Sequence, residues 1–102
     1  MPHLILEYTD NIDREVHFRN LFLRLHTILS DHGISMDNCK SRSVPLHSYL
    51  VGDGRTNGYF VHLELRFLEG RSTKTRQTIG EAMRTVLQEF FSPDAYPGLQ
   101  IT

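Results

Sequence analysis

The sequence of 102 residues predicts a small α/β (α+β) domain made of two duplicated β-α-β units. Each half opens on an apolar, strand-like run, HLILEY at residues 3–8 and HLELRF at residues 62–67. A polar break and then apolar residues at helical spacing follow each run. Two such units predict one four-stranded sheet with both helices on one face. We expect a single domain over residues 1–102, with halves at about 1–51 and 58–102.

The two helical segments carry the same apolar pattern, 58 residues apart. The spacing i, i+4, i+7, i+8 places each set on one stripe of a helix that faces a core. This correspondence favours duplication of one unit, although any two strand–helix units share part of it. The coinciding positions are Leu21, Leu25, Ile28 and Leu29 in the first half and Ile79, Met83, Val86 and Leu87 in the second.

The helices are expected at about residues 13–32 and 72–91. Gly33 suits the position after the first helix, because glycine adopts the left-handed conformation that commonly ends helices. Pro93 lies just beyond the second helix, which it cannot continue. Candidate N-caps are Asp10, Asn11 and Asp13 for the first helix and Ser72 and Thr73 for the second.

The remaining strands follow the helices. Residues 38–51 have strand character, and Pro45 within them predicts an edge position, a bulge or a bend, because proline lacks a backbone N–H group. Residues 52–58 are rich in turn formers and should form a loop. A third strand is expected at 59–68 and a short last strand at 99–102, which completes the order β-α-β-β-α-β.

Apolar residues fall on both faces of the predicted sheet. Some apolar strand residues share one parity along their strands, and the others do not all share the opposite parity. The first are Leu4, Leu6, Leu63 and Leu65, and the others are Ile5, Tyr8, Val61 and Phe67. With both helices on one face, the opposite face would leave a hydrophobic patch. The sequence therefore favours association into a pair or ring of subunits.

The composition argues against several classes of protein. The chain has 11 Lys and Arg, 12 Asp and Glu and a net charge of −1, which gives no bulk attraction to nucleic acid or membranes. It has no apolar stretch of the ~18–20 residues that span a bilayer. A signal peptide is not evident either, so we expect a cytoplasmic protein. Cys39 is the only cysteine, and the histidines lack metal-site spacing, so neither a disulfide nor a metal is expected.

Pro2 is the first candidate for chemistry. If Met1 is removed, Pro2 becomes the N-terminus and presents a secondary amine whose direction is fixed by its ring. An α-amino group titrates near pH ~7.7–8.0, so it can take up a proton and return it. The strand behind it would hold this amine in the fold. Most proteins that begin Met-Pro use the proline for no such purpose, so the rest of the chain must support the interpretation.

Several segments together resemble one family. In order along nearly the whole chain, they are similar to 5-carboxymethyl-2-hydroxymuconate isomerase, of the tautomerase superfamily. The resemblance implies a tautomerase-like trimer with sites near subunit boundaries, the N-terminal proline as general base, and no metal or cofactor. It implies a small unsaturated 2-hydroxy or 2-oxo carboxylic acid as substrate, in the breakdown of aromatic acids. The segments are residues 1–8 with Asp10-Asn11-Ile12, Lys40-Ser41-Arg42, Phe60-Val61-His62, Gly70-Arg71-Ser72, Arg76-Gln77 and Gly80-Glu81.

Three cations are the expected substrate-binding residues. Arg71 lies just before the second helix, beside backbone N–H groups and the positive end of the helix dipole. Lys40 and Arg42 alternate on the second strand and therefore point to one face. The resemblance implies arginine where this chain has Lys40. Lysine lacks the planar fork that binds a carboxylate through two hydrogen bonds, so the exact substrate stays open.

Other polar residues have simpler explanations. Arg76 is expected on the surface, and His3 and His62 are expected to pack or form hydrogen bonds. Lys40 would lower the pKa of the adjacent Cys39 thiol, although an inert buried thiol is the simpler interpretation.

Two alternatives to this isomerase stay open. One is a non-catalytic βαββαβ module that binds small ligands or assembles subunits. The other is a diverged relative that keeps the fold and has lost or changed the activity. The enzyme needs a free amine on Pro2 and convergence of Pro2, Arg71 and Lys40 or Arg42 on one pocket, whereas a binding module needs neither.

Overall fold

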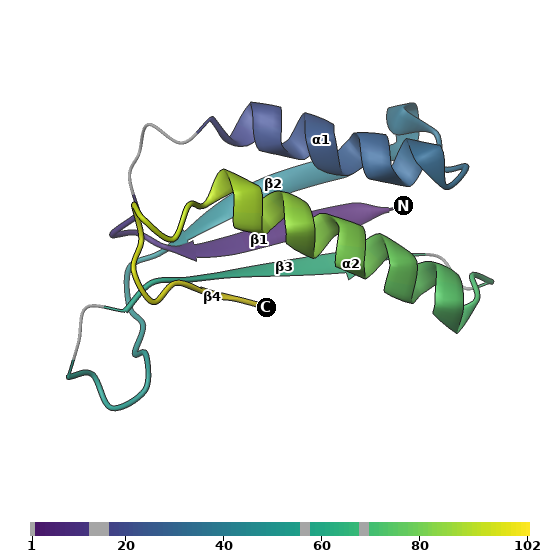
Figure 1. The fold of residues 1–102 in the computed structure, drawn as a ribbon. Coiled ribbons are helices and arrows are strands. Elements are labelled where there is room, and N and C mark those ends of the chain that lie inside the picture. Colours follow the sequence, from purple (N-terminus) through teal and green to yellow (C-terminus); the bar gives the residue numbers. More distant parts are fainter. Residues whose placement is uncertain (1, 13–16, 56–57, 68–69) are drawn as a thin grey trace.

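The computed structural model describes residues 2–12, 17–55, 58–67 and 70–102, and its elements follow the predicted order (Figure 1). The first half contains strand β1 (His3–Thr9), helix α1 (Phe18–Asp31), the 3-10 turn η1 (Met36–Asn38) and strand β2 (Lys40–Leu46). The second half contains strand β3 (Phe60–Arg66), helix α2 (Thr73–Phe90) and the short strand β4 (Gln100–Ile101).

One four-stranded sheet, in the order β2-β1-β3-β4, carries both helices on one face (Figure 1). Strand β1 pairs with β2 in parallel, and β3 pairs with β4 in parallel, as two β-α-β units require. Strands β1 and β3 are antiparallel neighbours, so the two halves meet at the centre of the sheet. The predicted fold class is confirmed.

The two helices bury equivalent positions against the sheet. Ile28 and Val86, the fourth coinciding pair, are half-buried. The buried positions are Leu21, Leu25 and Leu29 in α1 and Ile79, Met83 and Leu87 in α2. Leu4, Leu6 and Val61 of the sheet complete this core. The shared apolar stripe therefore corresponds to a shared packing role in the two halves.

Helix α1 ends as predicted. Ile34 donates its N–H to the carbonyl of Leu29, and Gly33 donates to Ser30, each at 3.0 Å. This pair of hydrogen bonds is the Schellman motif. Gly33 has a φ of 85°, a conformation that glycine adopts without strain. The chain can therefore turn sharply from the end of α1 towards β2.

The predicted N-caps of α1 are wrong. His17 holds the N-cap position, without a side-chain hydrogen bond. Asp10 instead forms an ion pair with His47, with 2.6 Å between Oδ2 and Nδ1. Asn11 donates its amide to the carbonyl of Gly58 at 3.0 Å. These two side chains hold loops from distant parts of the chain, and Asp13 lies outside the described residues.

Helix α2 begins at a predicted cap. The hydroxyl of Ser72 accepts the backbone N–H of Thr75 at 3.1 Å. Gly70 has a φ of 111°, which side-chain-bearing residues rarely adopt, so it suits the sharp turn that leads into the helix. Arg71 lies in this turn, between Gly70 and the N-cap residue Ser72.

Strands β2, β3 and β4 are shorter than predicted, especially β2, whereas β1 extends one residue further, to Thr9. Its edge position confirms the interpretation of Pro45, because a proline is tolerated where the sheet ends. Residues 36–38 form η1 rather than strand, and the chain leaves the sheet after Leu46. Of the expected third strand, residue 68 lies outside the described residues.

The sheet face opposite the helices carries polar residues together with an apolar minority, Ile5, Val44, Leu46 and Phe60. Because side chains alternate along a strand, this open face carries the residues between those that point to the helices. Leu4, Leu6, Leu63 and Leu65 all lie on the helix side. The open face consists of His3, Ile5, Glu7, Thr9, Lys40, Arg42, Val44, Leu46, Phe60, His62, Glu64 and Arg66.

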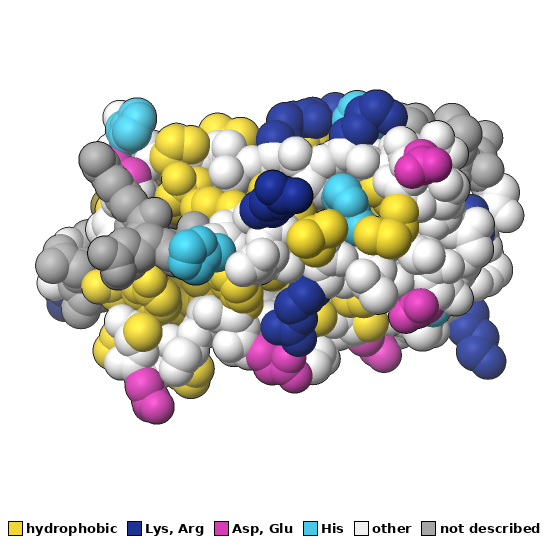
Figure 2. Space-filling model, turned by 90° about the horizontal axis from the view of Figure 1, so that it is seen from above, with side chains coloured by type: hydrophobic (Ala, Val, Ile, Leu, Met, Phe, Trp, Pro, Cys, Tyr) yellow, Lys and Arg dark blue, Asp and Glu magenta, His cyan; other side chains and the backbone are white. Residues whose placement is uncertain are grey.

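The helix side carries a mixed surface. Figure 2 shows hydrophobic side chains gathered towards one end of this side and Lys and Arg side chains across its middle and along one border. Arg24 of α1 and Glu89 of α2 join the helices through an ion pair at 2.5 Å. Within the described ranges, no helix combines the length and apolar character needed to cross a bilayer.

Candidate active site

Pro2 is buried immediately before β1. Its carbonyl oxygen accepts the backbone N–H of Lys40 at 3.2 Å. The next residue, His3, pairs with Lys40 of β2 on one side and with Arg66 of β3 on the other. The start of the chain is therefore anchored between two strands, and a base at Pro2 would have a defined place in the fold.

Arg71 lies at the turn into α2 and reaches the end of α1. Its Nη1 donates to the carbonyl oxygen of His32, the C-cap of α1, at 3.4 Å. The side chain is exposed, and the first turn of α2 has no acidic residue to offset the positive end of the helix. Because a guanidinium has five N–H donors, others remain for an anion.

Lys40 and Arg42 both lie exposed on the open face of β2. The Lys40 ammonium donates to the carbonyl oxygen of Asn38 at 3.1 Å. The Arg42 Nη1 lies 3.2 Å from Nδ1 of His3 on the neighbouring strand. The prediction that these two cations share one face agrees with the register of β2 against β1.

The four predicted site residues lie at one end of the fold but on two sides of the sheet (Figure 1). Pro2 has the parity of the buried Leu4, and Arg71 lies in the helix layer. Lys40 and Arg42 lie on the opposite, open face. In a single chain, Pro2 and Arg71 therefore lie on the other side of the sheet from Lys40 and Arg42.

His3 is a site residue whose contacts the sequence pattern did not reveal. It is surrounded by Lys40 and Arg42 of β2 and by Arg66 of β3. Partial burial lowers the pKa of His3, and the positive charges of Arg42, Lys40 and Arg66 act in the same direction. His62, its counterpart in the second half, bonds through Nδ1 to the hydroxyl of Thr102 at 2.8 Å. The contact between His3 and Arg42 depends on the register in which β1 and β2 pair, and the sequence pattern does not reveal that register.

The carboxylate beside this group of cations is engaged. Glu64 forms an ion pair with Arg66, with 2.7 Å between Oε1 and Nε. The hydrogen bond from Arg66 lowers the pKa of the Glu64 carboxyl, and the same bond raises the pKa of the guanidinium. The charge of Arg42 also lowers the pKa of Glu64, so this carboxylate offsets part of the local positive charge. Three cations against one carboxylate still leave this end of the open face positive and able to attract an anion.

Cys39 behaves as the simpler interpretation expects. Burial raises the pKa of its thiol, and this effect outweighs the lowering by the Lys40 charge. The thiol lies 3.5 Å from the carbonyl oxygen of Ser35. Among the residues that the structure describes, no group of three or more His, Cys, Asp or Glu side chains is placed to hold a metal ion.

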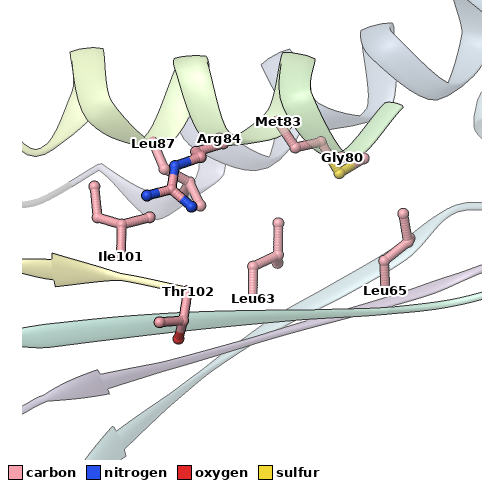
Figure 3. A pocket seen from close by; sticks show the side chains of 8 residues that line it. All are labelled: Leu63, Leu65, Gly80, Met83, Arg84, Leu87, Ile101 and Thr102. Carbon is pink, nitrogen blue, oxygen red and sulfur yellow. The ribbon is translucent and has the colours of Figure 1, made fainter. Parts of the chain in front are cut away.

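An apolar cavity of about 230 Å³ lies between α2 and the outer edge of the sheet (Figure 3). Leu63 and Leu65 point into it from β3, and Met83 and Leu87 point into it from α2. Arg84 is the one charged side chain that lines this cavity. Its lining includes none of the four predicted site residues, so it is separate from the predicted site.

The chemistry that the arrangement allows is binding and stabilisation of anions near a fixed N-terminal segment. Arg71 can offer hydrogen bonds to a carboxylate, and Lys40 and Arg42 can offset negative charge that develops on a substrate oxygen. Such a set suits a proton transfer in which an enolate or dienolate forms.

Comparisons with known proteins point to one family. The profile of the family described as 5-carboxymethyl-2-hydroxymuconate isomerase matches residues 2–97. The chain is 31% identical over 93 residues to the curated 5-carboxymethyl-2-hydroxymuconate Delta-isomerase of Escherichia coli. This match covers 90% of the chain and 74% of that relative.

Solved structures share the fold. A 5-carboxymethyl-2-hydroxymuconate isomerase from Deinococcus radiodurans R1 superposes with a TM-score of 0.88 at 31% identity, covering 99% of this chain and 78% of that one. A structure described as a Q0 fused 4-OT wild type symmetric trimer has a TM-score of 0.68 at 8% identity, covering 98% of this chain and 81% of that one. This second likeness shows the fold alone.

Proposed function

Because the chain belongs to the 5-carboxymethyl-2-hydroxymuconate isomerase family, we propose that Pro2 is the base of its reaction. The chain is an isomerase of the tautomerase superfamily. In the proposed reaction, the amine of Pro2, exposed by removal of Met1, takes a proton from an unsaturated 2-hydroxy or 2-oxo carboxylic acid. It returns the proton to another carbon, so that the double bond comes into conjugation with the carbonyl. The buried position of Pro2 at the start of a paired strand carries this proposal.

The environment of Pro2 suits a base that works near neutral pH. Burial disfavours a charged amine, and nearby cations act in the same direction. The secondary amine is then available in its neutral form to accept the proton. One group that both removes and returns the proton needs no metal or cofactor for this chemistry, and the proposal includes none.

The cations have two proposed roles. Arg71 binds a substrate carboxylate, helped by the positive end of α2. Lys40 and Arg42 bind negatively charged substrate oxygens, both in the bound substrate and as the proton leaves. These roles need electrostatic attraction and hydrogen bonds, which the exposed side chains of all three residues can supply.

The complete site is proposed to form between copies of the chain. Pro2 and Arg71 lie on the helix side of the sheet, whereas Lys40 and Arg42 lie on the open face, so a neighbouring copy would have to bring the missing cations to each proline. No strand of the described chain pairs with the outer edge of β3 beyond Leu63. Such an edge favours pairing with another chain. A homotrimer is the proposed assembly, as described for the distant structural relative.

The proposed substrate is 5-carboxymethyl-2-hydroxymuconate or a close analogue, by likeness to the relatives named for it. We also propose that the chain acts in the cytoplasm, in the breakdown of aromatic acids. Because the site residues are split across two faces of the sheet, the proposed reaction depends on assembly of the chain.

Arginine substitutions at the start of α2 test the binding role. Arg71→Ala should raise the KM for the carboxylate substrate about tenfold, because a charge-assisted bidentate contact is lost. Arg76→Ala, at an exposed position in the same helix, is the matched control and should change KM less than about twofold. Steady-state kinetics of the isomerisation, with circular dichroism to verify folding, gives both values. Equal KM values for the two variants would remove Arg71 from the proposed site.

A further inference from the structure

We propose that His3 is a positioning residue for Arg42, whose guanidinium it holds on the open face of the sheet through an unprotonated Nδ1 acceptor. The inference rests on the proposed function, in which Arg42 stabilises the reacting carboxylate substrate. It concerns a residue that touches the cation rather than the substrate.

The contact between the two side chains sets the protonation of His3. The Nη1 of Arg42 and the Nδ1 of His3 are 3.2 Å apart, across the register pairing of β1 with β2. A guanidinium can only donate, so the Nδ1 of His3 must accept and its ring must carry its proton on Nε2. An exposed arginine has several rotatable bonds, and one hydrogen bond to a fixed ring restricts them. His3 is fixed because its strand is paired on both sides.

The charges that face His3 keep the ring neutral. Arg42 and Lys40 face it from β2, and Arg66 faces it from β3. On this end of the face, Glu64 could favour a charged imidazole, but Arg66 already binds that carboxylate. Glu7, the other carboxylate on this face of β1, lies beyond Ile5 and therefore further from His3. Burial and the three cations lower the pKa of His3, so the acceptor form dominates at neutral pH.

Protonation of His3 would release Arg42. The protonated ring has no acceptor, and its positive charge would repel the guanidinium. Arg42 would then lose its fixed direction as the pH falls below the ordinary histidine range. The expected sign is therefore weaker substrate binding on the acid side.

Three variants of the full chain test the positioning role by kinetics. His3→Leu removes the acceptor and should raise KM about five- to tenfold while kcat changes less, because a hydrogen bond to a charged group is lost. His3→Asn keeps an oxygen acceptor near the Nδ1 position, should restore KM to within about twofold, and should remove the part of the acid-side loss of kcat/KM that comes from His3, leaving the part that comes from Pro2. His62→Asn, on the same face, is the matched control and should resemble wild type. The proposal fails if His3→Asn is no better than His3→Leu, or if His62→Asn shows the same loss.

A second measurement separates this proposal from the proposed function. The titration of His3 can be followed by NMR in wild type and in Arg42→Ala, without any reaction. We expect the pKa of His3 below the ordinary value in wild type and higher in Arg42→Ala. If the His3 titration changes in this way but wild type has no isomerase activity, the proposed function is wrong and the contact between His3 and Arg42 is still supported. An unchanged His3 titration in Arg42→Ala would overturn the contact even in an active enzyme.

Discussion

Lys40 presents one ammonium group where the family resemblance implies the two-pronged donor of an arginine. In the structure, this ammonium lies 3.1 Å from the carbonyl oxygen of Asn38, just outside β2. An ammonium is a strongly hydrated point charge, whereas a guanidinium matches the geometry of a carboxylate. The side chain at position 40 therefore affects the affinity of the open face for a carboxylate.

Lys40→Arg should improve binding. The added fork allows two parallel hydrogen bonds, so KM for the carboxylate substrate should fall about three- to tenfold. Lys74→Arg, the same change at an exposed position in the first turn of α2, is the control and should leave KM unchanged. Steady-state kinetics at equal folded concentration measures both. A KM that rises in Lys40→Arg would mean that the site requires the smaller cation.

Helix α1 is tied to the edge strand β2 by one side-chain contact. The Nε2 of His26 lies 2.5 Å from the hydroxyl oxygen of Ser41. His26 is half-buried beneath the helix, and burial lowers the pKa of its imidazole. Ser41 lies between Lys40 and Arg42, so this contact also supports the strand that carries both cations.

This contact predicts a pH dependence of stability. A histidine whose pKa is lowered by folding is protonated more readily in the unfolded chain, so the free energy of unfolding should fall as the pH drops below about 6.5. Above that value both states are neutral and the dependence disappears. The pKa of His3 is also lowered in the folded chain. Wild type must therefore be compared with a variant that removes only the contribution of His26 to the pH dependence.

His26→Gln is the informative variant, because the glutamine amide can reach Ser41 and does not titrate. Urea unfolding at about pH 7.5 and about pH 5 should show a smaller loss of stability on acidification in His26→Gln than in wild type. His17→Gln, at the exposed N-cap of the same helix, should lose as much as wild type. The same acid loss in His26→Gln and wild type would contradict the assignment.

At the scale of the whole molecule, periodicity predicts the fold because burial follows it. Leu21, Leu25 and Leu29, with their counterparts in α2, are buried as the helical stripe requires. The N-caps of α1 could not be predicted, because Asp10 and Asn11 bond to residues from the loop after β2. Those loop contacts depend on tertiary structure and leave no local signal.

The site could be predicted only in part, for a related reason. Chain position and residue chemistry single out Pro2 and Arg71, and alternation puts Lys40 and Arg42 on one face. The side of the sheet on which each residue lies depends on where the helices pack, and the contact of His3 with Arg42 depends on register. Alternation also predicts apolar residues on both faces of the sheet, and the open face carries Ile5, Val44 and Phe60 among its polar residues.

Assembly is the property on which the complete site depends. The outer edge of β3 beyond Leu63 has no strand partner in the described chain, and an apolar cavity lies beside it. Size-exclusion chromatography with light scattering should give three times the 11.8 kDa mass of one chain. A mass of one chain at about 10 μM or above, together with full activity, would contradict a site shared between subunits.

The measurement that tests the account most directly is the isomerase activity of wild type and Pro2→Ala, with intact mass to define each N-terminus. We expect active wild type to lack Met1 and the variant to lose at least about 100-fold in kcat, the usual contribution of a general base. Pro93→Ala, at an exposed proline after α2, should keep full activity. An active wild type that retains Met1, or a kcat unchanged by Pro2→Ala, would show that Pro2 is not the base.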